Sequence, residues 1–349
     1  MRTAIYLILF IFISYSEILA QRSNKSAVEK LSKSVFEETT LTGLKFRSIG
    51  PAQTSGRVSD FAINPNNFKE YYVAAASGGV WKTVNAGTTY IPVFDEAGSY
   101  SIGCITMDPN NANVIWVGTG ENNNQRSVPY GDGVYKSIDG GETWKNMGLK
   151  SSEHIGKILV DPNNSNIIYV AAIGPLWSSG GERGVYKSVN GGETWRLMLG
   201  IDADTGINDL IMDPRDSQVI YAAAYQRRRH VFTYLGGGPS SGLHKSVDGG
   251  TTWVDINKGL PEVDMGRIGM AMAPSDPEVI YAIVEASEGK GGFFMSTNRG
   301  ASWKKQGNYS TSGNYYQEIV VDPQDAQTVY AMNTWIQVSR DGGKTFKVL

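Results

Sequence analysis

Short apolar runs alternate with polar turn residues along most of the chain, and two phrases return in a fixed order. The first phrase is an apolar strand that ends in Asp-Pro or Asn-Pro, a few polar residues, and a second apolar strand. Its clearest copy is IGKILVDPNNSNIIYVAA at residues 155–172. Pro removes a donor from a sheet ladder and Asp or Asn starts a turn, so the phrase predicts a hairpin. The other copies end their first strand at Asn64-Pro65, Asp108-Pro109, Asp213-Pro214, Ala273-Pro274 and Asp322-Pro323.

The second phrase is GVYKSIDGGETW at residues 133–144, and it recurs as GVYKSVNGGETW at 184–195 and GLHKSVDGGTTW at 242–253. Looser copies begin at residues 79, 292 and 336. The phrase predicts a strand, a tight turn and a second strand, because Asp or Asn accepts hydrogen bonds from the N–H groups just ahead. A following Gly takes the positive φ of the bend. We therefore predict a structural role for the acidic or amide residue of each turn: Asn85, Asp139, Asn190, Asp248, Asn298 and Asp341.

The two phrases together give four strands per repeat. The Ser or Thr of the second phrase falls at positions 83, 137, 188, 246, 296 and 339. Four-stranded units at this spacing are typical of a β-propeller, and the 3.6-residue period of a helical repeat is absent. We predict an all-β chain with about six four-stranded antiparallel blades, either as the whole propeller or as part of a seven-bladed or larger ring. The blades are expected at residues 57–95, 100–149, 154–201, 206–259, 266–309 and 315–349, within a propeller domain of residues 44–349.

The segment before the repeats resembles a targeting signal. Residues 1–20 hold a positive start, an apolar run and a small-residue cleavage site, which predicts a signal peptide and an exported protein, whether secreted, periplasmic or on the cell surface. Residues 21–43 form a polar leader. No later apolar run is long enough to predict a membrane span. Residues 44–49 resemble the last strand of a further blade, so we expect either a monomer or part of a longer chain with seven or more blades.

Composition and charge exclude several function classes. The 32 Lys and Arg residues nearly balance 34 Asp and Glu residues, so no strong positive field predicts binding to nucleic acid. The single cysteine, Cys104, rules out a disulfide framework. The three histidines, His154, His230 and His244, lack metal-ligand spacing, and no Gly-rich loop opens a helix. We therefore expect no metal and no cofactor.

Long insertions between the second and third strands distinguish three of the copies, and they follow Gly120, Ile173 and Ala224. Because strand direction alternates, these insertions share one rim, while the Pro corners and Asp or Asn turns share the other. Variable loops on a rigid scaffold commonly carry function, so this rim is the predicted binding face. The candidate binding residues are Glu121, Asn123, Arg126, Tyr130, Trp177, Arg183, Gln226, Arg227 and His230, with Glu182, Arg228 and Arg229 on the same loops. The alternative is that the loops plug the central channel and pair charges with each other.

The phrases SIDGGETW, SVNGGETW and SVDGGTTW match the consensus S-x-D-x-G-x-T-W of the Asp-box. They resemble the repeats of sialidases, sortilin-type receptors, xyloglucanases and photosystem assembly propellers. The opening FRSIGPAQTSGRVSDFAINP and the insert GTGENNNQRSVPYGDGVYKS are similar to exported bacterial proteins of the sortilin amino-terminal, BNR-repeat group, which are often labelled glycosyl hydrolases. The resemblance covers residues 44–349 and implies a β-propeller.

The catalytic motifs of the enzymes in these families are poorly matched. Sialidases have an arginine triad and a Phe-Arg-Ile-Pro phrase, of which FRSIGP at residues 46–51 keeps only part. Xyloglucanases carry a catalytic Asp in an Asp-x-Gly-Gly phrase, where this chain has Ala76 before Gly78 and Gly79, and their second catalytic Asp belongs to a second propeller. A hydrolase would need two carboxylates about 5 to 9.5 Å apart. The acids nearest the rim are Glu121, Asp132 and Glu182.

Three functions follow as hypotheses, in order. The first is an exported, non-catalytic propeller that binds a protein, peptide or glycan, because aromatic and Arg side chains in the insertions suit contact hot spots. The second is a glycoside hydrolase acting on an extracellular polysaccharide. The third is an assembly factor for envelope proteins.

Overall fold

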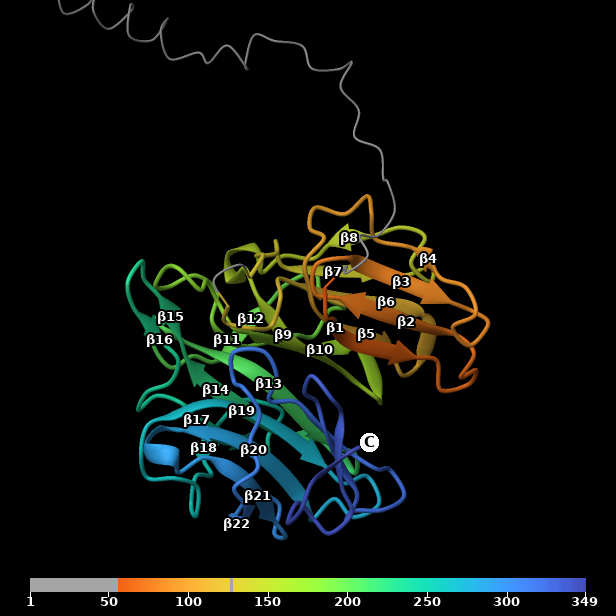
Figure 1. Cartoon of the computed structure of the whole chain (residues 1–349). Coiled ribbons are helices and arrows are strands. Elements are labelled where there is room, and N and C mark those ends of the chain that lie inside the picture. Colours follow the sequence, from red (N-terminus) through yellow and green to blue (C-terminus); the bar gives the residue numbers. More distant parts are fainter. Residues whose placement is uncertain (1–55, 126–127) are drawn as a thin grey trace, which may run out of the picture. The chain divides into compact units, whose positions relative to one another are not determined.

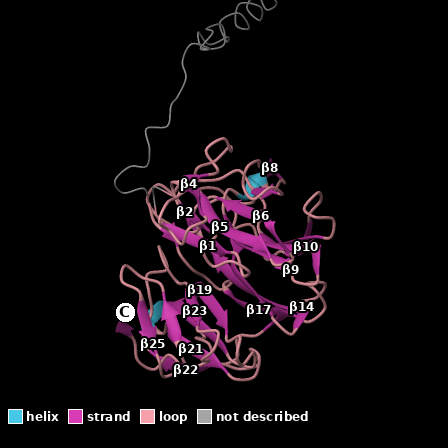
Figure 2. Cartoon of the chain, turned by 90° about the vertical axis from the view of Figure 1, so that its right-hand side faces the viewer, coloured by secondary structure: helices cyan, strands magenta, loops and turns pink. Residues whose placement is uncertain are grey.

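The described part of the computed structural model, residues 56–125 and 128–349, contains six four-stranded antiparallel sheets and one two-stranded hairpin (Figure 1). Within this part, helix is limited to two three-residue 3₁₀ turns, Lys150–Ser152 and Ser287–Gly289, and strands joined by loops make up the rest (Figure 2). The predicted all-β propeller with six four-stranded antiparallel blades is confirmed. The predicted signal peptide, polar leader and strand at residues 44–49 lie outside the described residues, as does Arg126.

Each sheet is built from strands that follow one another in the chain, and Figure 1 shows the sheets in the same order from orange to blue. The first sheet contains β1 (Val58–Ile63), β2 (Tyr71–Ala75), β3 (Gly79–Thr83) and β4 (Ile91–Pro92). The second contains β5 (Ile102–Asp108), β6 (Asn111–Thr119), β7 (Val134–Ser137) and β8 (Lys145–Asn146). The third contains β9 (Ile155–Asp161), β10 (Asn164–Ala172), β11 (Gly184–Ser188) and β12 (Arg196–Leu199).

The fourth sheet contains β13 (Thr205–Asp213), β14 (Asp216–Gln226), β17 (Gly242–Ser246) and β18 (Val254–Asp255). A separate hairpin of β15 (Arg228–Arg229) and β16 (Tyr234–Leu235) lies between β14 and β17 in the sequence. The fifth sheet contains β19 (Met265–Met272), β20 (Ile280–Ala286), β21 (Gly292–Ser296) and β22 (Lys304–Gly307). The sixth contains β23 (Ile319–Val321), β24 (Val329–Ala331), β25 (Gln337–Ser339) and β26 (Lys347–Val348).

The turn between the third and fourth strands has the same hydrogen bonds in every sheet, and we call it the Asp turn. In the second sheet, Ser137 Oγ donates to Asp139 Oδ1 (2.7 Å) and accepts from the Gly141 N–H (2.8 Å), while Asp139 Oδ1 accepts from the Thr143 N–H (2.9 Å). The other five sheets repeat all three bonds. The residue after the Asp or Asn has positive φ in each turn, 71° at Gly140 and 57° at Ala86. The turn residues themselves therefore specify the bend.

The hydrophobic core lies between consecutive sheets rather than within one. Five clusters of buried residues join sheets one and two, two and three, three and four, four and five, and five and six. A polar contact accompanies the packing: the Tyr72 hydroxyl and Lys82 Nζ of the first sheet both donate to the Gly140 carbonyl of the second sheet's Asp turn (2.8 and 3.1 Å). Each sheet is thus completed by its neighbours, as expected for a repeat that cannot bury its own faces.

Candidate functional site

The two rims of the propeller differ in construction. On one rim, which we call the turn rim, each Asp turn lies against the corner between the first and second strands of its own sheet. In the second sheet, for example, the Gly140 N–H of the Asp turn donates to the Asn113 carbonyl at the corner (2.8 Å). The loops after β6, β10 and β14 lie at the opposite ends of the strands, on the rim that we call the loop rim. Most of the predicted binding residues are on the loop rim.

Residues 121–125, the segment that follows β6, connect distant parts of the loop rim. The Asn124 side-chain amide donates to the Tyr225 hydroxyl (2.7 Å) in the fourth sheet and to the Gly313 carbonyl (3.3 Å). The Asn124 backbone N–H donates to the Asn314 carbonyl (3.1 Å), which precedes the sixth sheet. A loop of the second sheet thus reaches the fourth sheet and the connection into the sixth, so it extends across the mouth of the channel.

Buried arginines hold this segment in place. Arg227 is 1% exposed, and its guanidinium donates to the Asn123 carbonyl (2.8 Å), to Asn124 Oδ1 (2.6 Å) and to the Gly174 carbonyl (3.1 Å). Arg267 donates to the Asn122 carbonyl (2.7 Å). Burial lowers the pKa of Arg227 to about 9, which leaves the side chain charged at neutral pH. The charge faces carbonyl and amide oxygens, so the guanidinium acts as a cross-link between loops.

Glu121 and His154 form the base of the same segment. The Glu121 carboxylate is ion-paired with Arg57, and its backbone N–H donates to Ser101 Oγ (2.9 Å). His154 Nδ1 lies 3.0 Å from the Glu121 carbonyl, and because a carbonyl only accepts, the imidazole is the donor. Burial, followed by the positive charge of Arg227, holds the pKa of His154 well below its usual value, so the ring is neutral.

The remaining predicted binding residues fall into two groups. Arg183 is buried and donates to the carbonyls of Ile173 (2.8 Å), Gly180 (2.9 Å) and Ser178 (2.9 Å), so it organises its own loop. Gln226 is half-buried and accepts from the Ser240 N–H. The exposed group comprises Tyr130, Trp177 and His230. The structure therefore brings Glu121, Asn123 and Arg227 together and leaves the exposed group on the surface.

The three carboxylates nearest the rim each have separate partners. Asp132 Oδ2 accepts from the Tyr135 hydroxyl (2.6 Å) of its own sheet. Glu182 Oε2 accepts from both the N–H and the Oγ of Ser151 (2.9 Å each). Glu121, as described above, pairs with an arginine of the first sheet. Among the described contacts, no hydrogen bond links these three side chains to one another.

A set of charged residues on or directly before the first strands was missed by the sequence interpretation, and we call it the channel layer: Asp60, Lys157, Asp209, Arg267 and Glu318. Lys157 Nζ lies 3.6 Å from Asp60 Oδ2, and Arg267 lies 3.4 Å from Glu318 Oε1. Burial raises the pKa of Asp209 and, separately, that of Glu318. The signal was present in the sequence, because Asp60, Lys157, Asp209 and Glu318 each stand four residues before the Asn or Asp of a corner.

Two channel-layer carboxylates also connect neighbouring sheets. Asp60 Oδ2 accepts from the Ile105 N–H of the second sheet (3.2 Å), and Asp209 Oδ2 accepts from the Met270 N–H of the fifth sheet (2.8 Å). Each uses its other oxygen for the N–H of the next residue in its own strand. The same contact in two repeats indicates a structural role for these two acids.

An exposed apolar tip on the loop rim was also missed. In the turn of the β15–β16 hairpin, Val231 is 77% exposed and Phe232 is 96% exposed. The Arg229 N–H donates to the Leu176 carbonyl (2.7 Å), which fixes the hairpin beside the loop that carries Trp177, itself 49% exposed. Large apolar groups exposed side by side are typical of contact surfaces.

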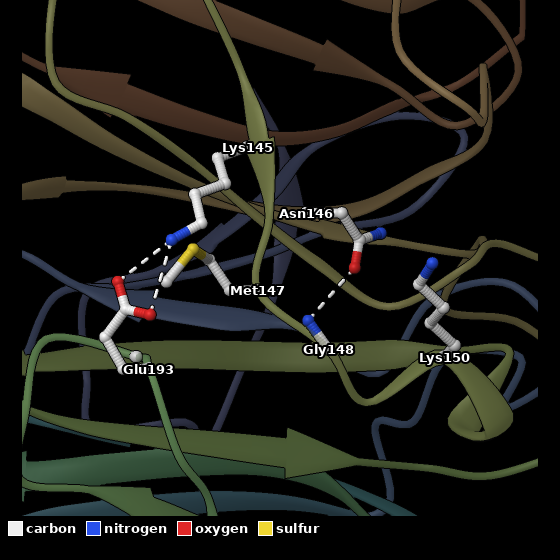
Figure 3. Close-up of a pocket in the computed structure, with 7 residues that line it drawn as sticks. Lys145, Asn146, Met147, Gly148, Lys150 and Glu193 are labelled. Carbon is white, nitrogen blue, oxygen red and sulfur yellow. Dashed lines mark hydrogen bonds and ion pairs between the residues drawn. The ribbon is translucent and has the colours of Figure 1, made fainter.

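A cavity of about 340 Å³ lies elsewhere, between β8 and the Asp turn of the third sheet. Lys145 and Glu193 form an ion pair there (3.0 Å), as Figure 3 shows, and both side chains are more than half exposed. An exposed pair of this kind contributes little to binding or stability. The lining contains none of the predicted site residues: Lys145, Asn146, Met147, Gly148, Lys150, Gly192 and Glu193.

Residues 56–125 and 128–349 contain neither a candidate metal-binding cluster nor an exposed cysteine thiol. No group of three or more His, Cys, Asp or Glu side chains in this part could hold a metal ion. Cys104 is buried, and burial raises the pKa of its thiol, which keeps it protonated. No helix in the described part of the chain is long and apolar enough to cross a membrane.

Fold and site together define a β-propeller whose channel mouth is crossed by an ordered polar loop. In sequence, the chain is similar to the xyloglucanase Xgh74A of Acetivibrio thermocellus (24% identity, 79% of this chain, 36% of the relative) and to a xyloglucanase of Paenibacillus sp (26%, 74% and 21%). It spans about a third or less of the length of these curated relatives. No family model matches the chain.

Solved structures agree on the fold. The Xanthomonas campestris GH74 xyloglucanase has a TM-score of 0.61 at 17% identity, over 82% of this chain and 45% of that one. The Niastella koreensis GH74 enzyme has a TM-score of 0.60 at 20% identity, over 81% and 45%. A YCF48 structure bound to D1 peptide has a TM-score of 0.53 at 15% identity, over 85% and 83%. At these identities, the likeness establishes the propeller architecture alone.

Proposed function

We propose that this chain is a non-catalytic propeller that binds a polypeptide ligand at the loop rim. The observation that carries the proposal is that two exposed apolar side chains, Trp177 and Phe232, lie on connected segments: the buried Arg183 organises the loop of Trp177, and the Arg229 N–H joins the hairpin of Phe232 to the Leu176 carbonyl of that loop. Exposed aromatic groups on a preorganised backbone lose little conformational entropy on binding. Tyr130, which is 72% exposed, extends this set on the loop after β6.

A polypeptide is favoured over a glycan by the chemistry of the hairpin tip. Val231 beside Phe232 offers an aliphatic as well as an aromatic surface, which suits apolar side chains better than hydroxyl-rich sugars. The YCF48 structure bound to D1 peptide gives a precedent for a peptide ligand on this architecture. Export, inferred from residues 1–20, would place the ligand outside the cytoplasm.

The test is a binding screen of the full chain on peptide and glycan arrays, followed by affinity measurements on substituted chains. We expect W177A and F232A each to weaken binding of the best peptide by about 10-fold or more. F68A is the matched control, because Phe68 is 76% exposed but lies at the corner between β1 and β2 on the turn rim. Binding to glycans only, or an equal loss in F68A, would contradict the proposal.

A second candidate function is glycoside hydrolysis, which two observations support. The chain is similar in sequence to xyloglucanases, and Glu318 in the channel layer has a raised pKa, as a general acid requires. Against it, Glu121, Asp132 and Glu182 are held by separate partners. Release of reducing ends from xyloglucan by the parent chain, lost in E121Q, E182Q or E318Q, would establish hydrolysis and overturn the non-catalytic proposal.

A further inference from the structure

Arg183 and Arg227 are buried next to each other on the loop rim, at 5% and 1% exposure. Every oxygen that accepts a hydrogen bond from either guanidinium belongs to a backbone carbonyl or to the side-chain amide of Asn124. Gly174 lies against both side chains, because its carbonyl accepts from Arg227 (3.1 Å) and a Cβ placed on it would lie 2.8 Å from Arg183 Nε. Two positive charges therefore share one buried region.

The acidic residues around these arginines do not neutralise them. Asp204 is ion-paired with Arg228 instead (3.4 Å), and both of those side chains are partly exposed. Burial raises the pKa of Glu153, although the charges of Arg183 and Arg227 act in the opposite direction. A buried charge without a close opposite charge is costly, so the region is short of negative charge.

The excess of positive charge also acts on neighbouring side chains. Burial, and after it the charges of Arg227 and Arg183, hold the pKa of His154 well below its usual value. Burial is the main cause of the lowered pKa of Arg227, and the charges of Arg183 and Arg267 contribute in the same direction. A further positive charge is thus disfavoured in this region, whereas a negative charge would be stabilised.

Two buried donors in the region have no acceptor among the described residues. They are the Nε–H of Arg227 and the side-chain Nδ2 of Asn123, a residue that is 1% exposed. The two residues are in direct contact, because another nitrogen of Arg227 donates to the Asn123 carbonyl (2.8 Å). A buried donor without an acceptor is destabilising. A water molecule would accept from these donors but would leave the positive charge uncompensated, whereas an anion would serve both needs.

We propose that Arg227 and Asn123 bind a small monovalent anion of the size of chloride inside the loop rim. The anion would accept from Arg227 Nε and Asn123 Nδ2 and would offset the charge of Arg183. Burial of both donors restricts the site to a small ion, because a larger anion would have to displace the loop after β6. The site would hold together the loops after β6, β10 and β14, which carry these three residues. The inference does not depend on the proposed polypeptide ligand.

The test compares thermal unfolding of the full chain in sodium chloride, sodium bromide and sodium gluconate at equal ionic strength. Gluconate is too large for an enclosed site, so it controls for general screening by salt. We expect chloride and bromide to raise the midpoint of unfolding by at least about 3 °C over gluconate, with saturation as the halide concentration rises. R227M should abolish this difference. R215M is the control, because Arg215 is paired with Asp213 (3.0 Å) and Glu278 (2.9 Å), and it should keep the difference.

A second variant, N123D, keeps the test decisive even if R227M fails to fold. Its carboxylate supplies the negative charge from within the chain and keeps an oxygen for the Gln125 N–H, which donates to Asn123 Oδ1 (2.9 Å). N123D should therefore unfold at the same midpoint in chloride and in gluconate, and no lower than the parent does in gluconate. In parent crystals soaked in bromide, we expect an anomalous peak at hydrogen-bond distance from Arg227 Nε. Equal midpoints of the parent in the three salts, a halide effect that N123D retains, or no bromide at Arg227 would overturn the proposal.

Discussion

The turn rim and the loop rim reach order by different routes. Each Asp turn is held by hydrogen bonds among residues no more than four positions apart, such as Ser137, Asp139 and Gly141. The loop rim is held by contacts such as that between Arg227 and Asn124, which lie 103 positions apart. The bend of each Asp turn is therefore specified by its own residues, although a neighbouring sheet also contacts the turn, while the loop rim forms only when several sheets are already in place.

This difference predicts how substitutions combine. Changes at separate Asp turns share no partners, so their effects on the free energy of unfolding should add. Changes within the network of Arg227, Asn124 and Tyr225 should not add, because each loss leaves the same buried groups without a partner.

The largest expected effect is at Arg227. R227M keeps an unbranched apolar side chain but leaves two carbonyls and the Asn124 side-chain oxygen unpaired in the interior. We expect the free energy of unfolding to fall by about 2–4 kcal/mol, measured by urea denaturation. R228M is the control: Arg228 is part-exposed and pairs with Asp204, so its loss should cost about 1 kcal/mol or less. Equal effects of the two changes would contradict the view of Arg227 as a cross-link.

The contrast between the rims also explains what the sequence could predict. The Asp turns were readable because Ser, Asp and Gly occur at the spacing that their bonds require, and four strands per repeat followed from that spacing. The loop rim was located from the insertions alone. Whether Arg227 faces solvent or Asn124 depends on the distance between two loops in the folded ring, and no local pattern contains that distance.

The channel layer was partly predictable from the sequence, unlike the loop-rim contacts and less fully than the Asp turns. Asp60 and Asp209 interrupt apolar strands at the same offset from the corner, so their alignment was visible in the sequence. Their bonds to N–H groups of the next sheet required the structure. The exposure of Phe61 (51%, against 2% for Ile105) was likewise invisible, because both residues continue the apolar strand pattern in the same place relative to the corner.

An intermediate effect is expected at the turn-rim serines. S137A removes the acceptor of the buried Gly141 N–H, which should lower the free energy of unfolding by about 1–2 kcal/mol. S246A, in the fourth sheet, removes the same bond from Gly250, so its cost should be similar and the double variant should show the sum. A coupling energy above about 0.5 kcal/mol between the two, measured by urea denaturation, would show that the turns are not independent.

The smallest expected effect separates turns that carry Asp from those that carry Asn. Hydrogen bonds, first from the Thr143 hydroxyl and then from its N–H, lower the pKa of Asp139 to about 2, from an ordinary value of 3.8. Asp248 and Asp341 are lowered to about 2 by the equivalent threonines. Because the folded pKa is depressed, this stabilisation is present above about pH 4 and is lost as the pH falls toward 2. Asn190 makes the same backbone contact without a titrating group.

The chain with D139N, D248N and D341N should therefore fold normally at neutral pH and lose less stability than the parent between pH 4 and 2. The measurement is the urea midpoint across that range, and a single E193Q chain, which removes an exposed carboxylate outside the Asp-turn hydrogen bonds, is the control. The acid dependence of the control should follow the parent. If the triple variant also followed the parent, the negative charge of the Asp-turn carboxylates would make no contribution to the free energy of unfolding. Asp and Asn would then be equivalent at this position at every pH.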